Sequence, residues 1–184
     1  MISGAKISRI LVRSVMALLL AAIALKALFF GNYKIPQNGM YPSLPAGSRI
    51  WTSKHAYKTV SDVKHGDVIV FNVDEGGGRY VYVWRVIALP GETVHAAGES
   101  LSINGRPVQR DAAREVAGIK LFREQIEGAS YEIAFGENPS GEPPEVSITV
   151  PKNHLFVMGD NRNDSRDSRY LGPIAFDSIV GKKL

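Results

Sequence analysis

The sequence predicts a mainly β protein tethered by one N-terminal transmembrane helix, and three observations lead to this fold class. A single long apolar run lies close to the N-terminus, and nothing after Tyr33 is both long and helix-periodic. Short segments rich in β-branched and aromatic residues recur instead, each bounded by turn residues. The 184 residues are 45% hydrophobic and 22% charged, which suits one anchored, folded domain and argues against disorder.

The anchor is predicted over residues 14–30, an apolar run interrupted only by Lys26. As a helix this run spans roughly 26 Å, slightly less than a hydrocarbon core of about 30 Å. Both Lys26 and Arg13 lie near enough to its ends to snorkel to the membrane surface. The alternative is a cleaved secretory signal ending at the small residues Ala22–Ala24. The apolar segment continues to Phe30, however, which favours an uncleaved anchor.

Basic residues before the apolar run predict its orientation. Lys6, Arg9 and Arg13 precede the run, so residues 1–13 are expected in the cytoplasm and residues 31–184 outside it.

Strands are expected at eight places after the anchor. A run of three glycines, Gly76–Gly78, indicates a hairpin between the second and third of them, and Asn104-Gly105 marks a second tight turn. Asp111–Gln125 fits either a short helix or an irregular strand, and Asn138–Glu145 is expected to be an exposed loop. The expected strands are Ser48–Thr52, Asp67–Val73, Arg79–Leu89, Ser100–Ile103, Ser130–Phe135, Val146–Val150, Leu155–Met158 and Ile174–Ile179.

Within the third strand, Tyr80–Leu89 is apolar on both faces except for Arg85, so it is expected to be central and well covered. A buried arginine needs a carboxylate because an unpaired buried charge costs several kcal/mol. We expect Arg85 to pair with Asp160 or Asp167.

Composition excludes several functions. The absence of cysteine excludes disulfides and thiolate chemistry. A net charge of +4 could suit nucleic acid, but the basic residues are scattered, so no nucleic-acid partner is expected. The four histidines show no ligand spacing, so neither a metal nor another cofactor is expected.

Three blocks follow the anchor in order: KIPQNGMYPSL at Lys34–Leu44, WRVIALPGE at Trp84–Glu92, and GDNRNDSRDSRYLGP at Gly159–Pro173. A further block, Gly66–Phe71, precedes the second. Together with the anchor they resemble the sequence blocks of type I signal peptidases. The resemblance implies a signal-peptidase-like antiparallel β core with a smaller β lobe at about 98–149, placed outside a bacterial plasma (inner) membrane.

The resemblance fails at the catalytic positions. Where the family has its serine nucleophile this chain has Gly39, and where it has its lysine base this chain has Trp84. The position of the serine whose hydroxyl helps to hold the oxyanion is Gln37. A Ser–Lys mechanism needs a hydroxyl beside a neutral amine, and an indole N–H can only donate. These three differences together predict that the chain does not carry out this reaction.

Other residues are assigned by the same resemblance. Ser43 and Ser165 are the fallback nucleophiles, and Ser165 falls at the serine that supports the lysine in active members. The expected substrate groove comprises Pro36, Met40, Tyr41, Pro42, Leu44, Tyr82 and Trp84, and the expected structural ion-pair network comprises Arg85, Asp160, Arg162, Asp167 and Arg169.

Three functions are compatible with these residues. The favoured one is a non-catalytic protein that binds an exported preprotein, another extended peptide segment or an active signal peptidase, as a chaperone, assembly factor or regulator. The second is an active signal peptidase with a rearranged serine site. The third is a structural membrane protein whose groove is blocked by Trp84.

Overall fold

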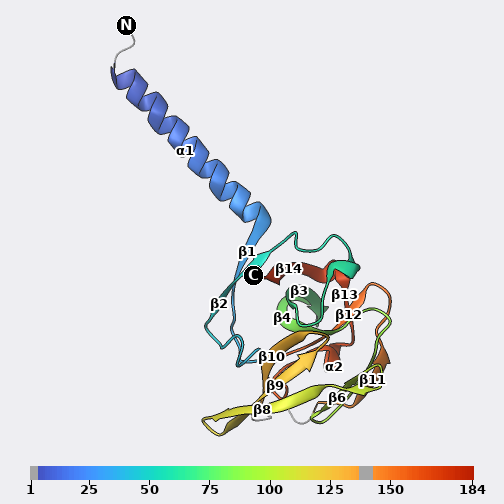
Figure 1. The fold of residues 1–184 in the computed structure, drawn as a ribbon. Coiled ribbons are helices and arrows are strands. Elements are labelled where there is room, and N and C mark those ends of the chain that lie inside the picture. The colour runs from blue at the N-terminus through green and yellow to red at the C-terminus, as the bar shows by residue number, and fades with distance from the viewer. Residues whose placement is uncertain (1–3, 137–142) are drawn as a thin grey trace.

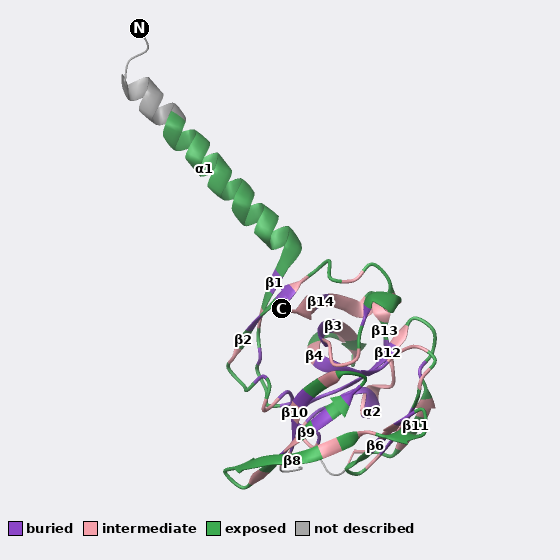
Figure 2. Ribbon diagram, viewed as in Figure 1, coloured by how far each residue is buried: buried purple, intermediate pink, exposed green. Residues whose placement is uncertain are grey.

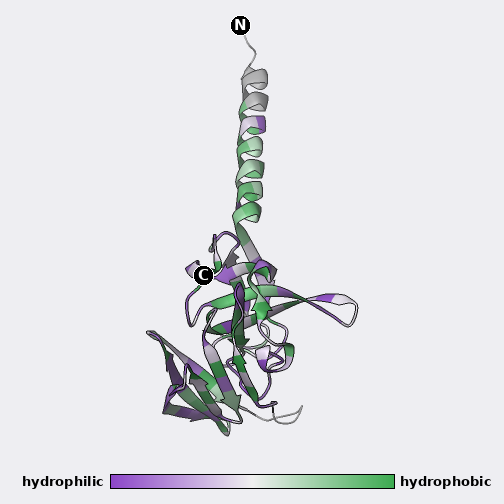
Figure 3. Cartoon of the chain, turned by 90° about the vertical axis from the view of Figure 1, so that its right-hand side faces the viewer, coloured by the Kyte–Doolittle hydropathy of each residue, from purple (hydrophilic) through white to green (hydrophobic). Residues whose placement is uncertain are grey.

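The computed structural model describes residues 4–136 and 143–184 and shows a long helix joined to a β body (Figure 1). Helix α1 (Gly4–Phe29) passes directly into strand β1 (Phe30–Lys34). Within α1, Leu11–Phe29 is long and apolar enough to cross a membrane, and its side chains are exposed along the helix (Figures 2 and 3). The helix starts before the expected Ser14 because Lys and Arg are good helix formers, and Phe30 belongs to β1.

The largest sheet carries both termini of the β body. Within the described residues its strand order is β1-β2-β14-β3-β4-β12-β13, and its neighbours pair antiparallel. Its further strands are β2 (Arg49–Ser53), β3 (Val68–Glu75), β4 (Gly78–Ala88), β12 (His154–Met158), β13 (Ile174–Ala175) and β14 (Ile179–Lys183).

Two smaller sheets form the other end of the body. One has the order β11-β5-β6-β7 and the other β10-β9-β8. Their strands are β5 (Thr93–Ala97), β6 (Ser100–Ile103), β7 (Arg106–Pro107), β8 (Gln109–Val116), β9 (Ile119–Ile126), β10 (Ala129–Phe135) and β11 (Val146–Thr149). The short helices are α2 (Ser168–Leu171) and the 3₁₀ turns Val60–Asp62 and Phe176–Ser178.

Both turns that the sequence indicated are present. Glu75 pairs with Gly78 across the β3–β4 hairpin. Asn104 and Gly105, with φ of 52° and 74°, join β6 to β7. The ambiguous Asp111–Gln125 is a hairpin of β8 and β9, and its turn places Ala117 and Gly118 at φ of 50° and 80°.

Strands β4 and β12 separate two hydrophobic cores. Val86 and Val157 pack into the core that lies against β3, whereas Ile87 and Phe156 pack into the core of the smaller sheets. Successive side chains of a strand point to opposite faces, so these two strands are covered on both sides.

Two expectations about strands were wrong. Strand β4 is buried on both faces only towards its C-terminal end, and Tyr80 and Val81 are 52% and 53% exposed. The reason is that β12 pairs with β4 only at Arg85–Ala88. Ile174–Ile179 is not one strand, because the turn Phe176–Ser178 divides it into β13 and the start of β14. Of the expected loop Asn138–Glu145, the part up to residue 142 lies outside the described residues.

Candidate functional site

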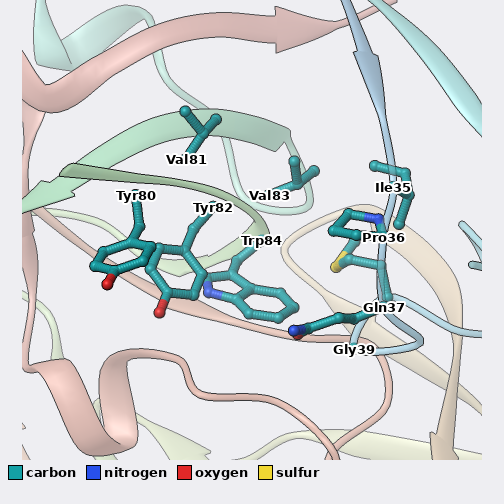
Figure 4. Close-up of a pocket in the computed structure, with 10 residues that line it drawn as sticks. Ile35, Pro36, Gln37, Gly39, Tyr80, Val81, Tyr82, Val83 and Trp84 are labelled. Atoms are coloured by element: carbon teal, nitrogen blue, oxygen red, sulfur yellow. The ribbon is translucent and has the colours of Figure 1, made fainter. Parts of the chain in front are cut away.

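A cavity of about 230 Å³ lies between the loop after β1 and the half of β4 that β12 does not cover (Figure 4). The loop contributes Ile35, Pro36, Gln37, Gly39 and Met40, and β4 contributes Tyr80, Val81, Tyr82, Val83 and Trp84. Of the residues expected in the groove or at catalytic positions, six line this cavity: Pro36, Gln37, Gly39, Met40, Tyr82 and Trp84. Tyr41, Pro42 and Leu44 were also expected in the groove but do not line it.

Gly39 and Trp84 are in direct contact. A β-carbon added to Gly39 would lie 2.5 Å from Cη2 and 2.6 Å from Cζ3 of Trp84, and 3.1 Å from the carbonyl oxygen of Asp164. Ordinary carbon contacts are about 3.5–4.0 Å. The indole therefore occupies the space that any side chain at residue 39 would need, so glycine at 39 fits tryptophan at 84.

The indole of Trp84 is held firmly and has no basic character. Trp84 is 6% exposed, and its ring centroid lies 5.9 Å from that of Tyr82. Its Nε1 is buried and has no hydrogen-bond partner among the described residues. Gln37 is exposed, and its side-chain amide points towards the indole ring in Figure 4. The cavity thus contains an indole where a proton acceptor would be needed.

Backbone hydrogen bonds fix the loop against the β body. The Asn161 amide donates to the carbonyl oxygen of Gly39 at 3.0 Å, and the Leu44 amide donates to that of Met40 at 2.7 Å. Met40 and Leu44 are buried in the core. The carbonyl of Gly39 is therefore already engaged, and one wall of the cavity is rigid.

The expected partner of Arg85 is Asp160. The guanidinium donates to Asp160 at 2.7 Å from Nε and at 2.6 Å from Nη2, and to the carbonyl oxygen of Gly66 at 2.8 Å. Asp167 instead accepts from Arg169, at 2.9 and 2.8 Å. Both pairs are buried, which confirms the prediction for Arg85.

Glu124 on β9 completes this network, and sequence reasoning missed it. Its carboxylate is fully buried, accepts from Arg162 at 2.8 Å and from Arg110 at 2.7 Å, and also accepts from the Tyr131 hydroxyl. Burial alone would raise the pKa of Glu124, but Arg162 and Arg110 outweigh burial and lower it to about 2. Glu124 therefore links the smaller sheets to the Gly159–Pro173 block by charge.

Neither fallback serine lies beside a base. Ser43 is exposed, and its hydroxyl accepts from the Arg85 guanidinium at 3.2 Å. Ser165 is buried and donates to the Asp167 carboxylate at 2.8 Å, which itself is paired with Arg169. An arginine remains protonated and cannot accept a proton, and the Asp167 carboxylate already accepts hydrogen bonds from Arg169.

The arrangement is suited to binding. Apart from the tyrosines, the residues that line the cavity have no titratable side chain, and burial raises the pKa of Tyr82. No group of three or more His, Asp or Glu residues within the described ranges is arranged to hold a metal ion.

The mainly antiparallel fold with its apolar N-terminal helix, together with the ordered blocks around this cavity, defines a signal-peptidase-like protein. The profile of the family described as "Signal peptidase, peptidase S26" matches residues 7–184, so the chain belongs to that family.

Two curated relatives agree with this assignment, and one solved structure is also similar. Signal peptidase I T of Bacillus subtilis is 34% identical over 92% of this chain and 79% of its own length. Signal peptidase I of Pseudomonas aeruginosa is 30% identical over 92% of this chain and 69% of its own length. A crystal structure of a signal peptidase I from Enterococcus faecalis V583 is 26% identical, covers 65% of this chain and 94% of that chain, and has a TM-score of 0.42.

Proposed function

We propose that this chain is a non-catalytic signal-peptidase-like protein that binds extended segments of exported proteins, as a chaperone, assembly factor or regulator. The contact between Gly39 and Trp84 carries the proposal: the indole fills the place of a nucleophile's side chain, while a cavity of about 230 Å³ remains open beside it. An open cavity also favours this function over a purely structural protein with a blocked groove.

The free side of β4 supports binding by strand addition. From Gly78 to Trp84, β4 pairs with β3 on one side and with no strand of the described residues on the other. Such an edge offers main-chain donors and acceptors to an extended peptide, and neighbouring pockets select its alternate side chains. Tyr80 and Tyr82, which line the cavity from β4, supply apolar surface for those side chains.

The apolar helix supports a location at the membrane. In this proposal α1 crosses the bacterial plasma membrane once, residues 1–13 lie in the cytoplasm and residues 31–184 lie outside. An exported preprotein would then meet the cavity on the outer face. An active signal peptidase is a further partner, if the protein regulates cleavage and does not itself cleave.

The test uses the full-length protein in detergent or vesicles with a radiolabelled preprotein. We expect no cleavage, but crosslinking of the uncut preprotein to a photoreactive residue placed at Gln37. The same photoreactive residue at Asp177, in the Phe176–Ser178 turn, is the control and should not crosslink. Cleavage that disappears on substitution of one serine would contradict the proposal.

Active catalysis is the second candidate, because the relatives carry the name signal peptidase I. It predicts that a hydroxyl-reactive label attaches to Ser43 or Ser165, and that Ser43→Ala or Ser165→Ala abolishes both labelling and cleavage. The double substitution Gly39→Ser with Trp84→Lys extends the test, since restored cleavage would demonstrate that the cavity accepts preproteins.

A further inference from the structure

A second cavity, of about 410 Å³, lies beside the same loop and has a different character. Asn38 and Tyr41 contribute to it from the loop, Asn161 and Asp164 from the Gly159–Pro173 block, and Ala117 from the β8–β9 turn. The cavity beside Trp84 is lined mainly by apolar and aromatic side chains, whereas this one brings two amides and a carboxylate together.

Asn161, which lines this second cavity, carries a hydrogen-bond acceptor without a partner in the described part of the chain. The residue is 6% exposed, and its Oδ1 is buried without a partner among the described residues. Its backbone is fixed, because its amide donates to Gly39 and its neighbour Arg162 donates to Ala134 at 2.8 Å. A buried acceptor without a partner is costly, so a polar ligand that donates to it gains affinity.

Asp164 adds a negative charge without a partner. No cation of the described residues lies within ion-pair distance of its carboxylate. The guanidinium of Arg162, next to Asn161 in sequence, pairs with Glu124, which also pairs with Arg110. The second cavity therefore offers two acceptors, one of them charged, and is suited to a cationic donor.

The two cavities meet at Gly39. A β-carbon there would touch Trp84, which lines the first cavity, and the backbone of Asp164, which lines the second. Asn38 and Gly39 are adjacent in the chain but line different cavities. An extended segment that leaves the first cavity across Gly39 reaches the second within a few residues, because each residue adds about 3.3 Å.

We propose that the second cavity binds a lysine or arginine side chain of the same extended segment, on the far side of Gly39 from its apolar residues. The inference rests on the proposed function of the first cavity and adds the class of segment that is bound. The ligand is an uncut peptide that is apolar on one side of Gly39 and basic on the other.

The experiment measures the affinity of full-length protein in detergent for fluorescent peptides with one apolar half. In the other half, one of the first four positions at a time carries Lys, Gln or Glu. At one position we expect the Lys peptide to bind about tenfold more tightly than the Glu peptide, the effect of one charge-assisted hydrogen bond. Asp164→Asn should reduce this ratio to about twofold or less, while the charge-matched control Asp177→Asn should leave it unchanged.

The outcomes distinguish the two proposals. Equal binding of the Lys and Glu peptides at every position would overturn the second cavity's role and leave the first intact. Equal binding of Lys and Gln, with Glu weaker, would also overturn it, since a neutral donor would then suffice. Absence of binding by every peptide would overturn both proposals. A photoreactive residue beside the preferred lysine should crosslink to the β8–β9 turn, and crosslinking elsewhere would contradict the placement.

Discussion

Replacing Gly39 by alanine should destabilise the protein through Trp84, and a double-mutant cycle can isolate this effect. The added β-carbon would lie 2.5 Å from the indole, about 1 Å closer than an ordinary contact. The indole is 6% exposed and must move within a packed wall, which costs about 1–3 kcal/mol. Gly39 does not have a positive φ, so its backbone accepts alanine without strain.

The matched background is Trp84→Leu, which removes the ring carbons that the new methyl group meets. There Gly39→Ala should change the free energy of unfolding by less than about 0.5 kcal/mol, because alanine also reduces the entropy of the unfolded chain. The coupling between the two sites should then be about 1–3 kcal/mol. Urea unfolding of the four proteins in nonionic detergent, followed by far-UV circular dichroism, measures it. An equal penalty in both backgrounds would refute the reasoning and attribute the clash to the Asp164 carbonyl.

Three further predictions concern the buried charges. The lowered pKa of Glu124 contributes about 3 kcal/mol of stability, which is fully present above pH 4.5, the ordinary pKa of the group, and is lost as the pH falls towards 2. Glu124→Gln should abolish this part of the pH dependence of stability, measured by urea titrations at acid pH. An unchanged loss of stability at acid pH would contradict the assignment. Asp160→Asn leaves Arg85 buried with a neutral partner and should cost about 3–5 kcal/mol, so a loss below 1 kcal/mol would show that water reaches Arg85. Ser165→Ala removes the two buried hydrogen bonds of its hydroxyl, which donates to Asp167 and accepts from Arg169, and should cost about 1–3 kcal/mol without changing peptide affinity. A large change in affinity would place Ser165 in the binding site.

The sequence predicts well those features that depend on a single residue's chemical need. An arginine in an apolar strand requires a carboxylate, and Arg85 has Asp160. Three consecutive glycines require a turn, and Gly76 and Gly77 lie at positive φ between β3 and β4. The mainly β class follows in the same way, because short segments bounded by turns form sheets wherever they find partners.

Features that depend on the relative position of distant segments are not predictable in this way. Glu124 lies between two other polar residues, Arg123 and Gln125, in β9. Nothing in that stretch indicates that one arginine from β8 and another from the Gly159–Pro173 block bind its carboxylate. The exposure of Tyr80 depends on where β12 stops pairing with β4. The contact between Gly39 and Trp84 joins two positions that the resemblance singled out separately, and only the fold places one against the other.

The direct passage from α1 into β1 fixes the distance between the end of the helix and the loop after β1. Lys54 Nζ donates to the carbonyl oxygen of Ala27 at 2.7 Å, and Lys26 Nζ lies 4.4 Å from the centroid of the Trp51 ring, so helix and β body are fastened at their junction. The five residues of β1 then set the loop about 16 Å beyond the end of the helix. With α1 in a bilayer, a segment anchored in the same membrane must extend by about five residues to arrive at the start of this loop. In the proposed function, a chain whose spacer between its own anchor and its binding residues is shorter than this could not reach the loop.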